Sequence, residues 1–183
     1  EISRIALENK ILFHTDAVQT MGKINLDVKA SMVDMLSLSG HKFYAPKGAG
    51  ILYVKQNTKI NPILFGGGQE SGLFLGTENI INIGAMALAA TICCTKKKTK
   101  LNHIKELDSY FISLLEKSEI DYTINGKNRA SGIINLTLNK TKSPSFIINL
   151  DKEGYAISAG SACASGSTIG STTLTEIRLD AET

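Results

Sequence analysis

The sequence contains no tryptophan, and only three prolines and three cysteines among its 183 residues. Three cysteines are too few for the disulfide framework of a small secreted domain, and Cys93, Cys94 and Cys163 lack the spacing of a zinc site. The longest apolar stretch, residues 80–94, is shorter than the roughly 18 residues that a membrane-spanning helix requires. We find no secretory signal, and therefore expect a cytoplasmic protein. The short apolar stretch and the cysteine spacing lead us to expect no membrane span and no bound metal.

The chain also has only a small excess of positive over negative charge. The formal net charge is +3, and much of the excess lies in the run Lys96-Lys97-Lys98 together with Lys100. Such a small, local excess does not indicate a nucleic-acid partner, and a solvated helix end is the simpler interpretation. Hydrophobic residues make up 43% of the chain and charged residues 20%. These proportions are typical of a globular protein and exclude a disordered, collagen-like or coiled-coil chain.

The first sixty residues alternate between short apolar runs and short polar or helical stretches. The runs at residues 11–14, 33–38 and 49–54 have the length and composition of buried strands. Strands that alternate with short helical segments predict an α/β sheet.

The rest of the chain has a different pattern. Helical periodicity predicts helices at residues 79–94 and 101–116. After Asn125-Gly126 the pattern predicts strands at 132–138 and 155–158 and a helix at 145–152. We therefore predict the end of an α/β large domain at residues 1–85 and a smaller α+β domain at residues 86–183.

Two ionisable residues follow apolar runs in the predicted sheet. Asp16 comes just after the first run, and Lys42 comes after the second. The interval between them suits a strand, a short crossover and a second strand. If these strands are parallel, Asp16 and Lys42 both project from the carboxyl edge of one sheet, where ligands of open α/β sheets bind.

A lysine and an aspartate at such an edge fit pyridoxal 5'-phosphate, whose aldehyde needs an amine and whose pyridine nitrogen needs an acid. Gln19 could then donate to the phenolic oxygen of the ring, and Ser39 and His41 could hold the phosphate. The alternative is a surface lysine and an aspartate that caps a helix.

The cysteines differ in their surroundings. Cys163 lies in the run SAGSACASGS, whose other residues are all Ser, Ala or Gly. Such a loop leaves a thiol accessible, as a nucleophile requires, although a Ser/Gly linker with an incidental cysteine has the same composition. Cys93 and Cys94 lie in an apolar helix and are expected to be core residues. Thr77, in Gly76-Thr77-Glu78-Asn79, could cap a helix whose backbone amides meet an anion.

Together these stretches resemble the cysteine desulfurases, which are pyridoxal-phosphate enzymes of the class V aminotransferase family. The resemblance rests on HTDAVQTMGKI, DMLSLSGHKFYAPKGAGILYV, GGGQESG followed by GTEN, and SAGSACASGS, in the order and spacing of the family. It covers most of residues 1–167. It implies fold type I, with a large domain built on a mixed, mostly parallel sheet, and it implies a homodimer.

The resemblance also implies roles for individual residues in binding the cofactor. Lys42 corresponds to the lysine that forms the Schiff base, Asp16 to the partner of the pyridine nitrogen, and Gln19 to the partner of the phenolic oxygen. Residues at the positions of Ser39 and His41 contact the phosphate, and the residue at the position of Thr77 reaches the phosphate of the partner subunit.

The implied reaction removes sulfur from L-cysteine and yields L-alanine and a persulfide on Cys163. The sulfur then passes to an acceptor protein, either an iron–sulfur scaffold or a tRNA-thiolation enzyme. Beyond Ser167 the family has an Ile-Arg pair that binds the substrate carboxylate, and Ile177-Arg178 makes Arg178 the candidate here.

Three features depart from the family. The segment beyond Ser167 is shorter than in the family. Ser71 and Phe74 stand where relatives usually have arginines. The family's glycine/threonine phosphate loop, ring-stacking histidine and cofactor-contacting asparagine have no counterpart here and belong before Glu1. We therefore expect a C-terminal portion of a desulfurase, with apolar surface and a strand edge uncovered. A truncated or degenerate non-catalytic fragment and an enzyme of the selenocysteine lyase type are the two alternatives.

Overall fold

The computed structural model describes residues 1–141, 143–159 and 174. The chain divides into two compact units, Glu1–Glu106 and Leu107–Thr183. This division falls later than the predicted boundary at residues 85/86, because helix α3 (Ile80–Thr95) packs on the sheet of the first unit and belongs to it.

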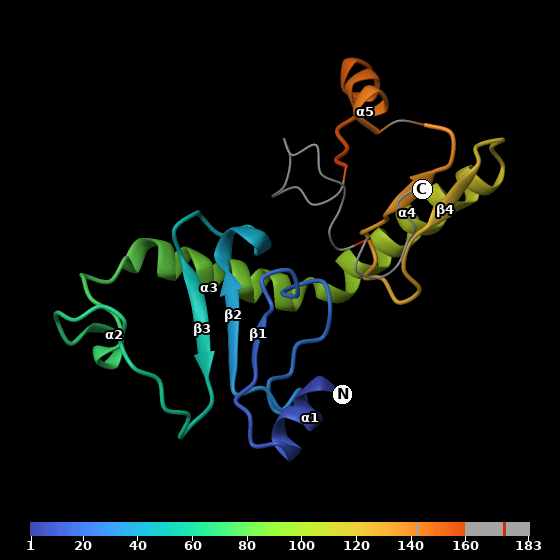
Figure 1. Ribbon diagram of the computed structural model, residues 1–183. Helices are drawn as coiled ribbons and strands as arrows, with labels where there is room; N and C mark the ends of the chain where they lie inside the picture. Colours follow the sequence, from blue (N-terminus) through green and yellow to red (C-terminus); the bar gives the residue numbers. More distant parts are fainter. Residues whose placement is uncertain (142, 160–173, 175–183) are drawn as a thin grey trace. The chain divides into compact units, whose positions relative to one another are not determined.

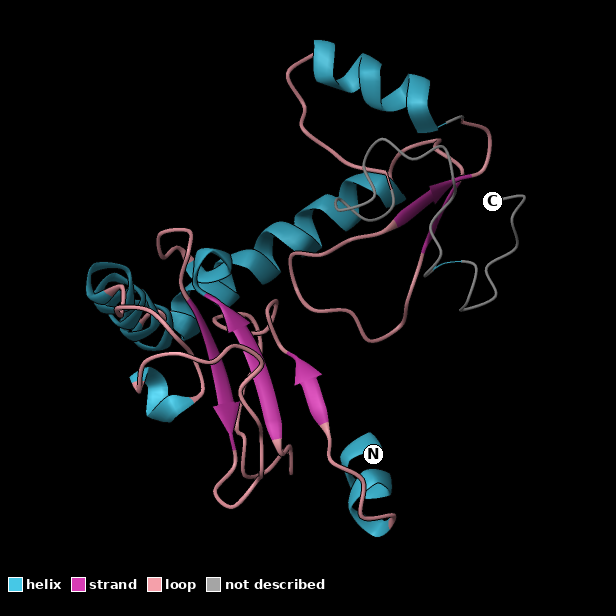
Figure 2. Ribbon diagram, turned by 60° about the vertical axis from the view of Figure 1, so that its left-hand side comes forward, coloured by secondary structure: helices cyan, strands magenta, loops and turns pink. Residues whose placement is uncertain are grey.

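The first unit contains a three-stranded mixed sheet in the order β1-β2-β3. β1 (His14–Asp16) runs parallel to β2 (Met35–Ser39), and β2 runs antiparallel to β3 (Gly50–Val54). Figure 2 shows these strands side by side, with β2 in the middle and β3 pointing the opposite way. The predicted mixed α/β architecture is confirmed, including the parallel pair.

β1 begins later than the apolar run at residues 11–14 predicts. Two residues after the preceding helix α1 (Ile2–Glu8), Lys10 has a left-handed conformation, at φ 56°. This lets the N–H of Ile11 return 2.8 Å to the carbonyl of Ala6 and close the helix. Ile11 and Leu12 are therefore exposed residues of the connection and not part of the strand.

Helix α3 crosses the sheet near the carboxyl ends of β1 and β2 (Figure 1). It buries Met86 and Cys93 against Phe43, which is only 1% exposed, and Ala45. Phe43 ends the short 3-10 helix η1 (Gly40–Phe43), which follows β2 directly. The core of this unit therefore joins α3 to the segment that carries Lys42.

Much apolar surface of the first unit is uncovered, as the sequence predicts. Large exposed side chains include Ile63, Phe65, Phe74, Ile80 and Ile81. Residues 69–72 form the single turn α2 (Gln69–Gly72), in which Glu70 and Ser71 have left-handed backbone conformations. Among the described residues no single helix is long and apolar enough to cross a membrane, and only α3 and the next helix, taken together across a 66° bend, meet that criterion.

The second unit is α+β, as predicted. Helix α4 (Lys97–Glu116) leads into it, β4 (Tyr122–Ile124) and β5 (Leu136–Leu138) form an antiparallel pair, and α5 (Ser143–Lys152) follows. Arg129 holds the loop between the strands to α4 through a 2.6 Å ion pair with Asp108. Residues 155–158 have no regular structure, so the strand expected there is wrong.

Asp34 ties the three strands together at the start of β2. Its backbone N–H donates to the carbonyl of Phe13 (3.0 Å), and its own carbonyl accepts from the N–H of Lys55 (2.8 Å). Its carboxylate accepts from the N–H of Phe13 (3.0 Å) and pairs with Lys55 Nζ at 3.4 Å. The Phe13 N–H above all, helped by Lys55, holds the pKa of the Asp34 carboxyl below its usual value.

Replacing Asp34 by asparagine should therefore destabilise the protein in a pH-dependent way. Because the folded pKa is lowered, the contribution of the carboxylate is complete above the ordinary aspartate pKa and is lost as the pH falls through the folded value. Urea denaturation at a series of pH values should show a stability gap between wild type and Asp34→Asn that narrows below about pH 4. Lys55→Met, which leaves the Phe13 contact intact, should cost less. A gap unchanged by acid would contradict this account.

Candidate active site

The Asp16 side chain, at the carboxyl end of β1, is oriented by a backbone N–H of the turn that follows it. One carboxylate oxygen, Oδ1, accepts the N–H of Val18 at 2.9 Å. The other oxygen has no hydrogen-bond or ionic partner in the described part of the chain. An aspartate in such a turn has a fixed orientation and keeps one oxygen free for a ligand.

Lys42 lies at the same edge of the sheet, in η1 at the end of β2. Its neighbours Gly40 and Phe43 are buried, while Lys42 itself is exposed. A Cβ on Gly40 would lie 3.0 Å from the carbonyl oxygen of Ala49 and 3.1 Å from Met86 Sδ, so a larger residue there would push on these neighbours. The Lys42 amine has no hydrogen bond or ion pair within the described ranges, which leaves it available to react.

Ser39 and His41 flank this lysine and contact each other. The hydroxyl of Ser39 and Nδ1 of His41 lie 2.9 Å apart. Which atom donates depends on the imidazole tautomer. A hydroxyl and an imidazole beside a turn form a small polar group of the kind that binds a phosphate oxygen.

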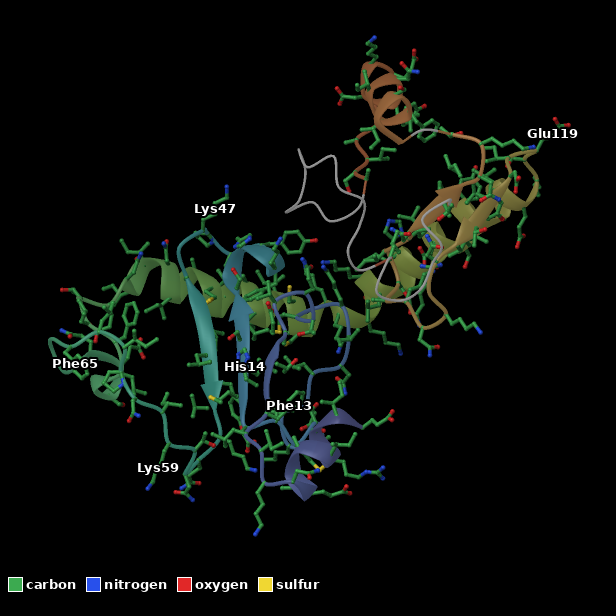
Figure 3. All side chains as sticks on the ribbon, viewed as in Figure 1. Phe13, His14, Lys47, Lys59, Phe65 and Glu119 are labelled. Atoms are coloured by element: carbon green, nitrogen blue, oxygen red, sulfur yellow. The ribbon has the colours of Figure 1, made fainter. Side chains whose placement is uncertain are left out.

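Gln19 follows Asp16 in the turn after β1. Its side-chain oxygen Oε1 accepts a hydrogen bond from Lys23 Nζ at 2.5 Å. A second polar contact joins β1 to β2, where His14 Nε2 and Ser37 Oγ are 2.8 Å apart. Figure 3 labels His14. Ser37 is the register partner of Asp16. The sequence analysis did not identify Lys23, His14 or Ser37, although Lys23 stands one helical turn beyond Gln19.

Cys93 of α3 holds the two polar segments in place. Its sulfur contacts the carbonyl of Phe43 in η1 at 3.7 Å. It also lies 3.3 Å from the position that a Cβ on Gly22 would occupy, in the turn that carries Gln19. The expectation that both Cys93 and Cys94 are core residues holds for buried Cys93 and is wrong for Cys94, which is exposed.

The predicted residues beyond the sheet are placed differently. Thr77 is exposed, and the helix that it was expected to cap is capped instead by Asn79, whose side chain accepts the N–H of Asn82 at 3.2 Å. Ser71 and Phe74 lie in and after the α2 turn, with Phe74 63% exposed. Cys163 and Arg178 lie outside the described residues.

The functional groups at the carboxyl edge match what pyridoxal phosphate requires. The edge offers a free amine, a carboxylate with one free oxygen, an amide, and a hydroxyl–imidazole pair, contributed by Lys42, Asp16, Gln19 and Ser39 with His41. These residues fit the group. No cluster of three or more His, Cys, Asp or Glu side chains suited to a metal occurs in the part of the chain that the structure describes. The fold and this edge together define an open α/β protein whose edge residues have the functional groups that an aldehyde cofactor requires.

Comparison with known proteins agrees with this class. The family model for aminotransferase class-V matches residues 1–178, and the chain belongs to that family. The cysteine desulfurase IscS of Dictyoglomus turgidum is 42% identical over 184 residues, and the cysteine desulfurase NifS of Azotobacter vinelandii is 39% identical over 171. These alignments cover 100% and 91% of this chain, and 47% and 42% of the relatives.

Solved structures give the same result. The NifS-like protein from Rickettsia africae superposes with a TM-score of 0.81 at 30% identity, over 87% of this chain and 45% of that one. SspA in complex with cysteine superposes with a TM-score of 0.74 at 34% identity, over 98% of this chain and 49% of that one. The chain spans about half the length of the curated relatives it matches.

The contact between Gly22 and Cys93 can be tested by substitution. Gly22 has φ +74°, and an added methyl group would meet the Cys93 sulfur, so Gly22→Ala should lower the free energy of unfolding by about 1–2 kcal/mol. Gly84→Ala is the matched control, because nothing lies within 4 Å of its Cβ position in the interior of α3. It should be neutral or raise stability by about 0.5–1 kcal/mol. Equal effects in urea denaturation would refute the packing argument.

Proposed function

We propose that this chain is part of a pyridoxal-phosphate-dependent cysteine desulfurase, which converts L-cysteine to L-alanine and retains the sulfur as a persulfide. The observation that carries the proposal is the common edge of β1 and β2, where the free amine of Lys42 and the free carboxylate oxygen of Asp16 both lie. The relatives named cysteine desulfurase support the choice of reaction within the family.

Pyridoxal phosphate, when bound, supplies an aldehyde that links to amines and a ring that withdraws electrons from the substrate Cα. Lys42 holds the cofactor and then, as a free amine, moves the Cα proton. The free oxygen of Asp16 pairs with the pyridine nitrogen and keeps it protonated. Ser39 and His41 bind the phosphate, and the Gln19 amide donates to the phenolic oxygen.

Cys163 performs the sulfur transfer in this proposal. Its thiolate attacks the substrate sulfur, so that a sulfur–sulfur bond forms while the carbon–sulfur bond of cysteine breaks. The carbon side keeps the electron pair, takes up a proton and leaves as alanine. Arg178 binds the substrate carboxylate as its bidentate partner.

We further propose a cytoplasmic homodimer in which Thr77 contacts the phosphate held by the partner subunit. The persulfide sulfur passes to an acceptor protein, an iron–sulfur scaffold or a tRNA-thiolation enzyme. Ser71 and Phe74 stand where relatives usually have two positive charges, in the loop before α3, so this part of a dimer contact would be uncharged.

Lys42→Ala tests the cofactor site. The full-length protein that contains this chain, purified with pyridoxal phosphate, should be yellow, and borohydride should fix the cofactor to the peptide that contains Lys42. Lys42→Ala should lose both the colour and the mass increase. Lys47→Ala is the control, because Lys47 is an exposed lysine of the next turn, and it should keep both. A colourless wild-type protein would favour the non-catalytic fragment instead.

Cys163→Ser tests the nucleophile. This variant should keep the yellow colour, while its release of sulfide from L-cysteine under reducing conditions should fall on the order of a thousand-fold or more. Cys94→Ser removes an exposed thiol from α3 and should keep wild-type turnover. Full activity of Cys163→Ser on L-cysteine would refute the assignment. Activity confined to L-selenocysteine would favour a lyase of that type.

A further inference from the structure

Lys23 contacts one of the proposed cofactor residues without being one itself. Its ammonium nitrogen lies 2.5 Å from Oε1 of Gln19. The two residues stand four apart in a turn after β1, where the N–H groups of Lys23 and Ile24 both donate to the carbonyl of Thr20, at 3.0 Å and 3.1 Å. The backbone therefore holds the lysine stem on the same side of the turn as the glutamine.

The turn is anchored to the core at both ends. Thr20 donates through its hydroxyl (2.7 Å) and its N–H (2.9 Å) to the carbonyl of Ala17, which is 2% exposed. Gly22, also buried, packs against Cys93 of α3. Lys23 is half-buried as a result, although it is one of the longest and most flexible side chains.

The chemistry of lysine decides which way the Gln19 amide points. An ammonium group has only donors, so the atom of the amide that faces it must be the oxygen. The NH₂ group of Gln19 then points away from Lys23 and is left to donate to another acceptor. With a neutral neighbour the two ends of an amide are nearly interchangeable, and its orientation is not fixed.

We propose that Lys23 is a positioning residue that locks the Gln19 side chain with its NH₂ group toward the cofactor. The inference rests on the proposed function, in which the acceptor is the phenolic oxygen of pyridoxal phosphate. Lys23 touches neither substrate nor cofactor and acts only through Gln19.

Three substitutions at this position separate orientation from simple loss of a side chain. Lys23→Met removes the donor and should weaken cofactor binding about three- to ten-fold, the effect of one hydrogen bond. Lys23→Glu presents an acceptor, which turns the Gln19 oxygen toward the cofactor, so its loss should be larger. Lys23→Arg keeps a donor and should restore wild-type binding. Lys29→Met, which removes an exposed lysine from the next turn, is the control for charge and should change nothing.

The measurements are the dissociation constant for pyridoxal phosphate and the position of the visible absorption band of the bound cofactor, with thermal melting of the cofactor-free proteins as the check on folding. The band should shift in Lys23→Met and Lys23→Glu and return in Lys23→Arg. In a Gln19→Ala background all Lys23 variants should behave alike, because the residue through which Lys23 acts is gone.

The outcomes distinguish this inference from the function on which it rests. A wild-type protein without a Lys42-dependent visible band would overturn both. A normal band that no Lys23 variant shifts would overturn the positioning role alone. Effects of Lys23→Glu that persist undiminished in the Gln19→Ala background would also overturn it, because they would show that the charge acts directly.

Discussion

The packing of α3 on two loops is the constraint from which the rest of the first unit follows. Met86 and Cys93 bury the ring of Phe43, and Cys93 also lies against Gly22. One helix thus fixes η1, which carries Lys42, and the turn after β1, which carries Gln19. A reactive lysine must be exposed, yet its backbone must be rigid. Here buried neighbours, Gly40 and Phe43, hold an exposed Lys42 between them.

The strands β1 and β2 place the site residues through the direction in which they run. Because β1 and β2 are parallel, their carboxyl ends lie at the same edge, and the residues that follow them meet there. Asp34 fixes the opposite end, where it bonds to Phe13 and Lys55 and so sets the register of all three strands. An error of one residue in that register would turn Asp16 to the other face of the sheet.

Much of this arrangement could be predicted from the sequence. The apolar runs before Asp16 and Lys42 predicted two strands, and the interval between them left room for the crossover of a parallel pair, which is the pairing that the structure has. The residues at which a strand or helix begins were predicted less well. The run at residues 11–14 has the composition of a strand, but the left-handed Lys10 uses its first residues to close α1. Thr77 has the chemistry of a helix cap, but Asn79, two residues later, takes that role.

The contacts that orient the candidate site could not be predicted in the same way. In the sequence, Cys93 cannot be told from the other apolar residues of α3, and only the fold brings its sulfur to Gly22 and to Phe43. Lys23 reads as a solvated lysine until the turn places it against Gln19. Such contacts depend on backbone positions that are far apart in the sequence or on turns that composition does not specify.

The two adjacent thiols of α3 differ in exposure, so their reactivity can report how stably this helix packs on the loops. Cys93 is 7% exposed and Cys94 faces solvent, although they share one peptide bond. An alkylating reagent reaches the second of them at once, but it reaches the first only when the helix separates from the loops beneath it. The ratio of singly to doubly labelled peptide, read by mass spectrometry, therefore reports how often that separation occurs, and no residue has to be substituted to introduce a reporter.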